Sequence, residues 1–291
     1  SLVNCNYDVV VTYQNERLKK SVERLVERAN NDILAKSSGT EASHGKSNIC
    51  TNPMLSCLPC DISQEESVQH LFQSALPRLL QDNNREAHIN NENICLDALV
   101  HSLAYAPADS MKEGSLLSTT RESFLLTHEI SAYSLISLAR NALPLLSCRP
   151  KEEHANKDDG TSTTTRTPSI TALTYIGSTL AIPNYNIMGP AKASLESIIR
   201  GLALELGPPP HSIRVNGVSA GPVSTMAAKG GIRGFSDMKQ DCEQRSPLRR
   251  NISGREVGET VAYLASGDFG SSGITGQVIF VDAGYSAVAG P

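Results

Sequence analysis

The segment Ser169–Ser219 reads "SITALTYIGSTLAIPNYNIMGPAKASLESIIRGLALELGPPPHSIRVNGVS". It begins and ends with short apolar, β-branched runs, and between them a helical pattern extends from Pro190 to Leu206. Strands that alternate with helices form a parallel sheet that is covered on both faces. The segment therefore predicts one strand–helix–strand unit of an α/β fold.

The same alternation continues on both sides of this segment. The runs "DVVV", "DALV" and "QVIFV" are nearly all apolar, as strands buried on both faces require. The expected strands are Tyr7–Tyr13, Leu55–Asp61, Ile94–Ala104, Ser169–Ile176, Ile213–Ser219 and Gln277–Val281. The expected helices are Glu16–Arg28, Gln64–Leu80, Ser118–Leu146, Pro190–Leu206 and Val257–Leu264. The last of these is expected to open with a capping box formed by Ser253 and Glu256. The sequence predicts a single Rossmann-like, doubly wound domain over residues 1–291.

Three polar stretches interrupt the alternation, at about residues 36–53, 82–93 and 149–168. They are rich in Asn, Ser, Thr and charged residues, and each falls between a helix and the next strand. A long surface excursion costs little stability at such a position. We therefore predict polar insertions without a catalytic role.

Composition excludes several classes of protein. The 291 residues carry a net charge of −4, which is unlike a nucleic-acid-binding chain. No run approaches the ~18 apolar residues that a membrane span needs. Seven scattered cysteines predict a reducing compartment without a disulfide framework. The pair Cys57 and Cys60 lacks the second pair that a zinc site needs, so no metal is expected.

Tyr175, Tyr185 and Lys192 are the candidate chemical groups. Seven residues is close to two helical turns, so Tyr185 and Lys192 would share a helix face. An ammonium beside a phenol lowers the pKa of the phenol, and such a tyrosine can donate a proton to a developing oxyanion. Tyr175 would lie at a strand end that faces the same region. From spacing alone, two ordinary surface residues remain the alternative.

At this point the sequence resembles a known family. "YIGSTLAIPNYNIMGPAKASLES", "VVVTYQNERLK", "LVHSLAYAP", "THEISAYS", "IRVNGVSAGPVSTMAA" and "VDAGYS" look like segments of the NADH-dependent enoyl-acyl-carrier-protein reductases of fatty-acid synthesis. These enzymes are a divergent branch of the short-chain dehydrogenase/reductases. Ordinary members of that superfamily space the tyrosine and lysine as Y-x3-K, whereas Tyr185 and Lys192 match the enoyl-reductase spacing Y-x6-K.

The resemblance implies reduction of a trans-2-enoyl thioester that is bound to acyl carrier protein. Tyr185 would hydrogen-bond the thioester carbonyl, Lys192 would hold the nicotinamide ribose, and Tyr175 is the family's other site tyrosine. The implied substrate contacts are Ala106, Tyr185 and Met226. The implied cofactor contacts are Gln14, Asp61, Ile62, Ser102, Leu103, Lys192, Val223, Thr225 and Ala227.

The resemblance implies NADH as the cofactor. Gln14 would lie near the adenosine ribose, where a neutral side chain tolerates a free 2′-hydroxyl. NADPH is less favoured, because its 2′-phosphate would call for a cation. Arg17, Lys19 and Lys20 are close enough in sequence to keep that alternative open.

The chain departs from the family pattern at two places. Pro190 stands where a helix former is expected; it would kink a helix that begins near Tyr185 and be harmless in one that begins at Gly189. No glycine-rich turn precedes Tyr7, so we expect that the first βα unit is missing. The strands Tyr7–Tyr13 and Ile94–Ala104 would then lack their shared neighbour. The alternative functions are a non-catalytic relative, kept as a scaffold or oligomer partner, and a reductase of another enone.

Three further expectations follow from the resemblance and the polar stretches. Met226–Ser246 would be a long connection that acts as a lid over the acyl chain. The protein would be a homotetramer. It would work in the stroma of a plastid-type organelle, with the cytoplasm as the alternative.

Overall fold

The computed structural model describes residues 2–3, 7–37, 54–84, 95–112, 114–147, 167–225, 234–267 and 270–288. The three predicted polar insertions lie almost wholly outside these residues. The chain divides into two compact units, Ser1–Ile89 and Asn90–Pro291, and each is described by itself. Whether they form a single domain stays a prediction.

The first unit is a strand–helix–strand arrangement followed by a helical segment. The strands β1 (Val9–Tyr13) and β2 (Leu55–Pro59) pair in parallel, with Val9 opposite Leu55. The connecting helix α1 (Glu16–Ser37) is longer than predicted. Asn30 fixes it to β2, because its side chain donates to Leu55 O at 2.9 Å and accepts from Leu55 N at 3.0 Å.

The helical segment after β2 confirms the prediction of one long helix there. It consists of α2 (Glu65–His70) and α3 (Leu76–Asn84), which a π-helical turn at Leu71–Ala75 joins. The first turn is acidic, with Glu65 and Glu66 near the positive end of the helix dipole.

The second unit contains a four-stranded parallel sheet in the order β3-β4-β5-β6. Its strands are β3 (Ala98–His101), β4 (Ser169–Thr174), β5 (Arg214–Ala220) and β6 (Val278–Val281). All four were predicted, although β3 is much shorter than the run Ile94–Ala104. The central strands β4 and β5 are almost completely buried, as expected for strands covered on both faces.

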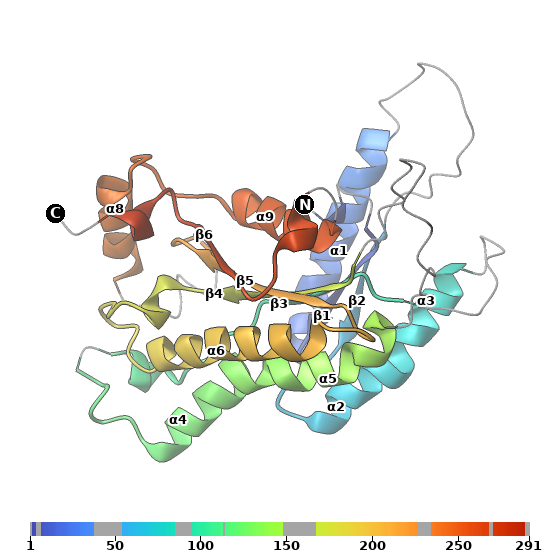
Figure 1. Ribbon diagram of the computed structural model, residues 1–291, viewed down its shortest axis with the longest axis horizontal. Coiled ribbons are helices and arrows are strands. Elements are labelled where there is room, and N and C mark those ends of the chain that lie inside the picture. The colour runs from blue at the N-terminus through green and yellow to red at the C-terminus, as the bar shows by residue number, and fades with distance from the viewer. Residues whose placement is uncertain are drawn as a thin grey trace. The chain divides into compact units, whose positions relative to one another are not determined.

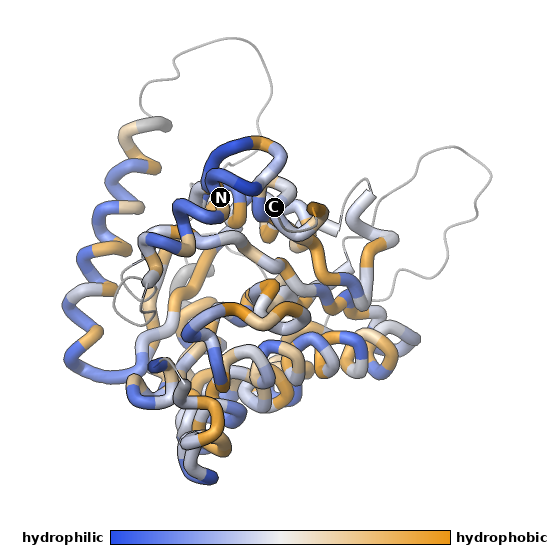
Figure 2. Tube along the Cα trace, turned by 90° about the vertical axis from the view of Figure 1, so that its left-hand side faces the viewer, coloured by the Kyte–Doolittle hydropathy of each residue, from blue (hydrophilic) through white to orange (hydrophobic). Residues whose placement is uncertain are grey.

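Helices cover both faces of this sheet. The helices α5 (Ser134–Leu146) and α6 (Met188–Leu206) pack on one face, and α9 (Gly254–Ser266) packs on the other (Figure 1). The helix α4 (Arg121–His128) continues into α5 through a π-helical turn at Glu129–Tyr133. Hydrophobic residues recur between hydrophilic ones along the helices, as expected for helices with one buried face (Figure 2). The predicted α/β fold with parallel strands is confirmed.

β1 and β3 are both edge strands. Among the described residues β1 pairs with β2, and β3 pairs with β4. That these two strands lack a shared neighbour stays a prediction.

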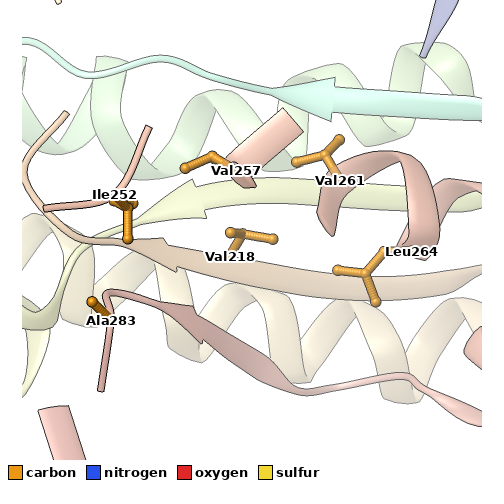
Figure 3. Packing of buried hydrophobic residues seen from close by; sticks show 6 residues of the cluster. All are labelled: Val218, Ile252, Val257, Val261, Leu264 and Ala283. Atoms are coloured by element: carbon orange, nitrogen blue, oxygen red, sulfur yellow. The ribbon is translucent and has the colours of Figure 1, made fainter. Parts of the chain in front are cut away.

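The core between β5 and α9 is a compact apolar cluster. Val218 of β5 lies opposite Val257, Val261 and Leu264 of α9, and Ile252 and Ala283 lie together at the end of the cluster away from Leu264 (Figure 3). The helix begins with the predicted capping box: Ser253 Oγ accepts from Glu256 N, and Ser253 N donates to Glu256 Oε2 at 2.8 Å. The cap fixes where α9 starts and therefore which side chains reach the sheet.

The connection after β5 differs from the prediction. The helix α8 (Phe235–Arg245) occupies much of Met226–Ser246 and was not predicted, and the role of this connection as a lid stays a prediction. Phe235 and Cys242 of this helix are buried, so it is anchored by its own apolar contacts.

The described part of the chain contains both free and disulfide-bonded cysteines. Cys57, Cys60 and Cys242 are free, whereas Cys95 is disulfide-bonded and so departs from the expectation of reduced cysteines. No group of three metal-ligating side chains occurs among these residues. None of the helices described here has the length and apolarity of a membrane span.

Replacing Leu264 tests the importance of the β5–α9 core. Leu264 is fully buried, so Leu264→Ala should lower the free energy of unfolding by about 2–5 kcal/mol. Leu204→Ala is the matched control, because Leu204 is 80% exposed and should change stability by only about 0.5 kcal/mol. Urea denaturation measures both, and equal losses would contradict the described core.

Candidate active site

Lys192 is a buried cation at the carboxyl ends of two strands. It lies on α6 with only 4% of its surface exposed. Its Nζ donates to Leu173 O at 2.9 Å and to Leu103 O at 3.4 Å. Leu173 belongs to β4 and Leu103 follows β3, so one ammonium ties together the ends of neighbouring strands. In a doubly wound sheet this edge is where ligands bind.

The start of α6 explains how Pro190 is tolerated. The helix begins at Met188, so Pro190 falls in the first turn, where a missing N–H removes no helical hydrogen bond. Gly189 N donates to Tyr185 O at 3.0 Å and Ala191 N donates to Ile187 O at 3.3 Å, so the turn is continuous on both sides of the proline. Of the two predicted outcomes for Pro190, the harmless one is observed. The prediction that Tyr185 and Lys192 share a helix face is wrong, because Tyr185 lies before the first residue of α6.

Tyr175 and Tyr185 pack against each other beside Gly177. Their ring centroids are 4.8 Å apart and the rings meet edge to face at 69°. A Cβ on Gly177 would lie 2.5 Å from Cδ1 of Tyr185 and 3.2 Å from Cδ1 of Tyr175. Only glycine fits under both rings at this distance, so Gly177 fixes how closely the two tyrosines approach β4.

Burial dominates the protonation of both tyrosines. It raises the pKa of Tyr185 and of Tyr175 above the usual range of a phenol. The prediction that Lys192 lowers the pKa of Tyr185 is therefore wrong, because loss of hydration on burial disfavours the phenolate and is the cause that acts on Tyr185. The hydroxyl of Tyr185 is held in its protonated form, which is the form that donates a hydrogen bond.

Burial also acts on Lys192 and on its neighbour His101. It lowers the pKa of Lys192 to about 8, and Glu196 opposes this shift. It lowers the pKa of His101, at the end of β3, to about 3, and the charge of Lys192 adds to that effect. His101 is therefore neutral, and Lys192 keeps a substantial fraction of its positive charge near neutral pH.

The tautomer of His101 follows from its partner. Ser134 Oγ donates to Ile130 O at 2.7 Å, so it accepts from His101 Nε2–H, also at 2.7 Å. His101 Nδ1 has no hydrogen-bond partner among the described residues. The ring thus presents a buried acceptor close to Lys192.

The segment after β3 is held by the π-helical turn of the α4–α5 helix. Ser131 Oγ accepts from Tyr105 N and donates to Tyr105 O, both at 3.0 Å. Ala106, a predicted substrate contact, packs against the cluster that contains Tyr185 and borders Tyr175. Ser102 is exposed at the same strand end. Ala106 thus lies with the two tyrosines, and Leu103 contacts Lys192.

The helix α8 contacts the hydroxyl of Tyr175. The Tyr175 hydroxyl donates to Met238 Sδ at 3.3 Å, and Lys239 Nζ donates to Ser224 Oγ at 3.0 Å. Two predicted cofactor contacts, Val223 and Thr225, lie in the segment after β5. Val223 packs on the β5–α9 core, and neither residue is in described contact with Tyr185 or Lys192. Met226 and Ala227 lie outside the described residues.

The predicted adenosine contacts lie in the first unit. Gln14, directly after β1, donates from Nε2 to Asp61 Oδ1 at 3.4 Å. Asp61 is held in turn by Ser63, whose N and Oγ donate to Oδ1 at 3.1 and 2.8 Å. Ile62 lies in the same turn after β2. The carboxyl ends of β1 and β2 therefore share one polar cluster, as predicted.

Sequence reasoning missed three supporting residues. Glu196 follows Lys192 by one helical turn, a spacing that the sequence displays, and accepts from Thr174 Oγ1 at 2.7 Å. Asn186, next to Tyr185, donates to Lys112 O and Ser115 Oγ, each at 2.6 Å. No sequence signal identifies Thr174 or Asn186, because their partners are distant in the chain.

The arrangement can stabilise an anionic oxygen that develops on a bound molecule. A neutral phenol is a hydrogen-bond donor, a nearby ammonium supplies positive charge, and burial strengthens both interactions. The buried ammonium at the strand ends also fits the ribose hydroxyls of a nicotinamide cofactor, because Nζ still has donor capacity beyond its two carbonyl partners.

Comparisons with known proteins agree with this geometry. The family described as "Enoyl-(Acyl carrier protein) reductase" matches residues 40–286. The FabI enoyl-[acyl-carrier-protein] reductase [NADPH] of Staphylococcus aureus is 36% identical over 280 residues, which cover 96% of this chain and 86% of the relative. The corresponding [NADH] enzyme of Salmonella typhimurium is 33% identical over 282 residues, covering 97% and 85%.

A solved structure shows the same fold. The Bacillus cereus enoyl-acyl carrier protein reductase, crystallised with NADP+ and indole naphthyridinone, superimposes with a TM-score of 0.72 at 31% identity. The match covers 99% of this chain and 89% of that one. Sequence and structure agree that this chain belongs to the enoyl-(acyl carrier protein) reductase family.

Proposed function

We propose that this chain reduces trans-2-enoyl thioesters of acyl carrier protein to saturated acyl thioesters in fatty-acid biosynthesis, with NADH as its cofactor. Family membership supports the reaction class. The observation that carries the proposal is the grouping of Tyr175, Tyr185 and Lys192 at the strand ends, with the seven-residue spacing of enoyl reductases.

The reduction requires an electrophile to be activated and a negative charge to be accommodated. Bound NADH supplies a hydride to the β-carbon of the enoyl group. Negative charge would then develop on the thioester oxygen, and the protonated hydroxyl of Tyr185 would donate a hydrogen bond to it. A proton that derives from solvent would then add to the α-carbon and complete the saturated thioester. Lys192 holds the ribose hydroxyls and adds positive charge near the same oxygen. Ala106 and the Tyr175 ring border the space for the acyl group.

The preference for NADH rests on Gln14. Its neutral amide follows β1 and donates to Asp61, so the pair presents no cation for a 2′-phosphate. Lys19 is the basic residue nearest to Gln14 in the sequence that has a described partner. Its Nζ forms an ion pair with Glu16 at 3.5 Å. Relatives named for NADH and for NADPH both occur, so the cofactor must be measured for this chain.

An assay with crotonyl thioesters tests the proposal. The purified, folded protein should oxidise NADH in the presence of the enoyl thioester, and NADPH should support a lower kcat/KM. Absence of NADH oxidation would contradict the reaction. Absence of both turnover and NADH binding would favour a non-catalytic relative instead.

We also propose a homotetramer that works in a plastid-type organelle. Tyr263 of α9 and Phe280 of β6 are 47% and 45% exposed and line one surface hollow, an apolar area that a second copy can bury.

The proposed location in a plastid-type organelle rests on the polar insertions, which suggest a eukaryotic gene. Light scattering tests the assembly, and a fluorescent fusion of the natural gene product tests the location.

Replacing Tyr185 tests its role as the donor. Tyr185→Phe removes the hydroxyl and keeps the ring, so kcat should fall roughly 10²-fold while the KM for NADH changes little. Tyr133→Phe is the control, since Tyr133 is 44% exposed and lies outside the proposed site. Equal activity of both variants would show that Tyr185 does not act on the substrate.

The charge of Lys192 predicts a pH dependence. Its pKa is lowered to about 8, so the ammonium is present below that pH and is lost as the pH rises through it. The kcat/KM for NADH, which reports groups of the cofactor-free enzyme, should therefore fall above about pH 8. A profile that stays level up to about pH 10 would be inconsistent with a required ammonium.

Adding one methyl group at Gly177 tests the packing of the two tyrosines. Gly177→Ala places a Cβ 2.5 Å from the Tyr185 ring, so the ring must move and kcat should drop at least about tenfold. Gly201→Ala on α6 is the matched control, because no atom lies within 4 Å of its added Cβ. It should leave activity unchanged, and the idea fails if Gly177→Ala does the same.

A further inference from the structure

Glu196 is a buried carboxylate that the proposed reaction does not use directly. It is 8% exposed and is the only acidic side chain among the buried residues described. A buried charge is costly unless a partner compensates it. Its hydrogen bond comes from Thr174 Oγ1, at 2.7 Å. Thr174 is the last residue of β4, so this bond fixes the carboxylate beside the strand end.

The position of Glu196 relates it to Lys192. The two residues are four apart on α6 and therefore lie on the same helix face. They form no ion pair within 4.0 Å in the described part of the chain, because Lys192 Nζ is turned to the carbonyls of Leu103 and Leu173. The negative charge acts instead across the buried interior, where Coulomb interactions are stronger than in water.

Other titratable groups around Lys192 do not supply this negative charge. His101 on β3 is neutral, and burial keeps Tyr185 and Tyr175 protonated. The elements that pack against α6 carry further titratable residues. Arg214 donates hydrogen bonds to Thr167 and Ser271. The others lie at the surface: Arg121, Glu122, His128, Glu129, Tyr133 and Arg140. Glu196 is thus the anion that balances the burial of Lys192 among the described residues.

We propose that Glu196, held in place by Thr174, is a positioning residue that keeps Lys192 charged and directed at the ends of β3 and β4. Glu196 contacts neither substrate nor cofactor in this account and acts through Lys192. Only the predicted effect on kcat/KM rests on the proposed function. The charge relation between the two side chains exists with or without turnover.

The test compares three substitutions. Glu196→Gln keeps the size and removes the charge, Glu196→Asp keeps the charge, and Glu205→Gln removes a charge from an exposed position of the same helix. Two readouts are recorded from about pH 6 to about pH 10. One is kcat/KM for NADH, and the other is the NMR titration of Lys192 Cε in protein labelled with 13C-lysine, assigned with Lys192→Met.

In Glu196→Gln both the loss of kcat/KM and the NMR midpoint should move about one pH unit lower, as expected when one nearby opposite charge is removed. The kcat/KM would then be about tenfold below that of the natural protein at high pH and nearly equal to it at low pH. Glu205→Gln should titrate like the natural protein, and Glu196→Asp should recover most of the shift.

A uniform loss at every pH, or a midpoint unchanged in Glu196→Gln, would overturn the inference and leave Glu196 a structural residue. If Glu196→Gln does not fold, Thr174→Val replaces it in the test. Removing the Thr174 hydroxyl frees the carboxylate of Glu196, so the titration midpoint of Lys192 should move in the same direction as in Glu196→Gln. An unchanged midpoint in Thr174→Val would count against the inference. If the natural protein oxidises no NADH, the proposed function fails, and the NMR midpoints still decide whether Glu196 sustains the charge of Lys192.

Discussion

The buried ammonium of Lys192 is the interaction on which the site depends. A lysine that is 4% exposed must replace its water with other dipoles, and two backbone carbonyls at the ends of neighbouring strands do so. This requirement fixes where α6 passes over the sheet. It also places a positive charge at the edge where a doubly wound sheet binds its ligands.

The tyrosines depend on close backbone packing rather than on charge. Gly177 allows Tyr185 to lie against β4, and the backbone of Gly177 also lies close to α6, because a Cβ on Gly189 would be 2.9 Å from Gly177 O. Tyr175 is enclosed from the other side by Met238 of α8. Burial keeps both hydroxyls protonated, so the site is prepared to donate a hydrogen bond rather than to accept a proton.

Local patterns predicted the fold well. The apolar runs of β4 and β5 and the capping box at Ser253 carry their own structural information, and each appears where it was expected. The end of β3 and the helix α8 were mispredicted. Hydrophobicity extends beyond the residues that pair in β3, and α8 is polar apart from a few residues such as Phe235 and Cys242 that pack on the rest of the unit.

The spacing of site residues along the chain was predictable, whereas the contacts made by folding were not, and Tyr185 lies before α6 rather than on its face. The spacing of Tyr185 and Lys192 is visible in the chain, but the bonds from Thr174 to Glu196 and from Asn186 to Ser115 span parts of the sequence with no common signal. The sign of the pKa shift of Tyr185 was missed for the same reason. It depends on how deeply the phenol is buried, which only the folded structure gives.

Isotope transfer from the cofactor tests the central claim most directly. The folded protein is incubated with crotonyl thioester and NADH deuterated at both C4 positions, and the product is analysed by mass spectrometry. The account predicts a saturated butyryl thioester with one deuterium at the β-carbon. A product reduced at the carbonyl, or a saturated product without deuterium at the β-carbon, would contradict enoyl reduction by this chain.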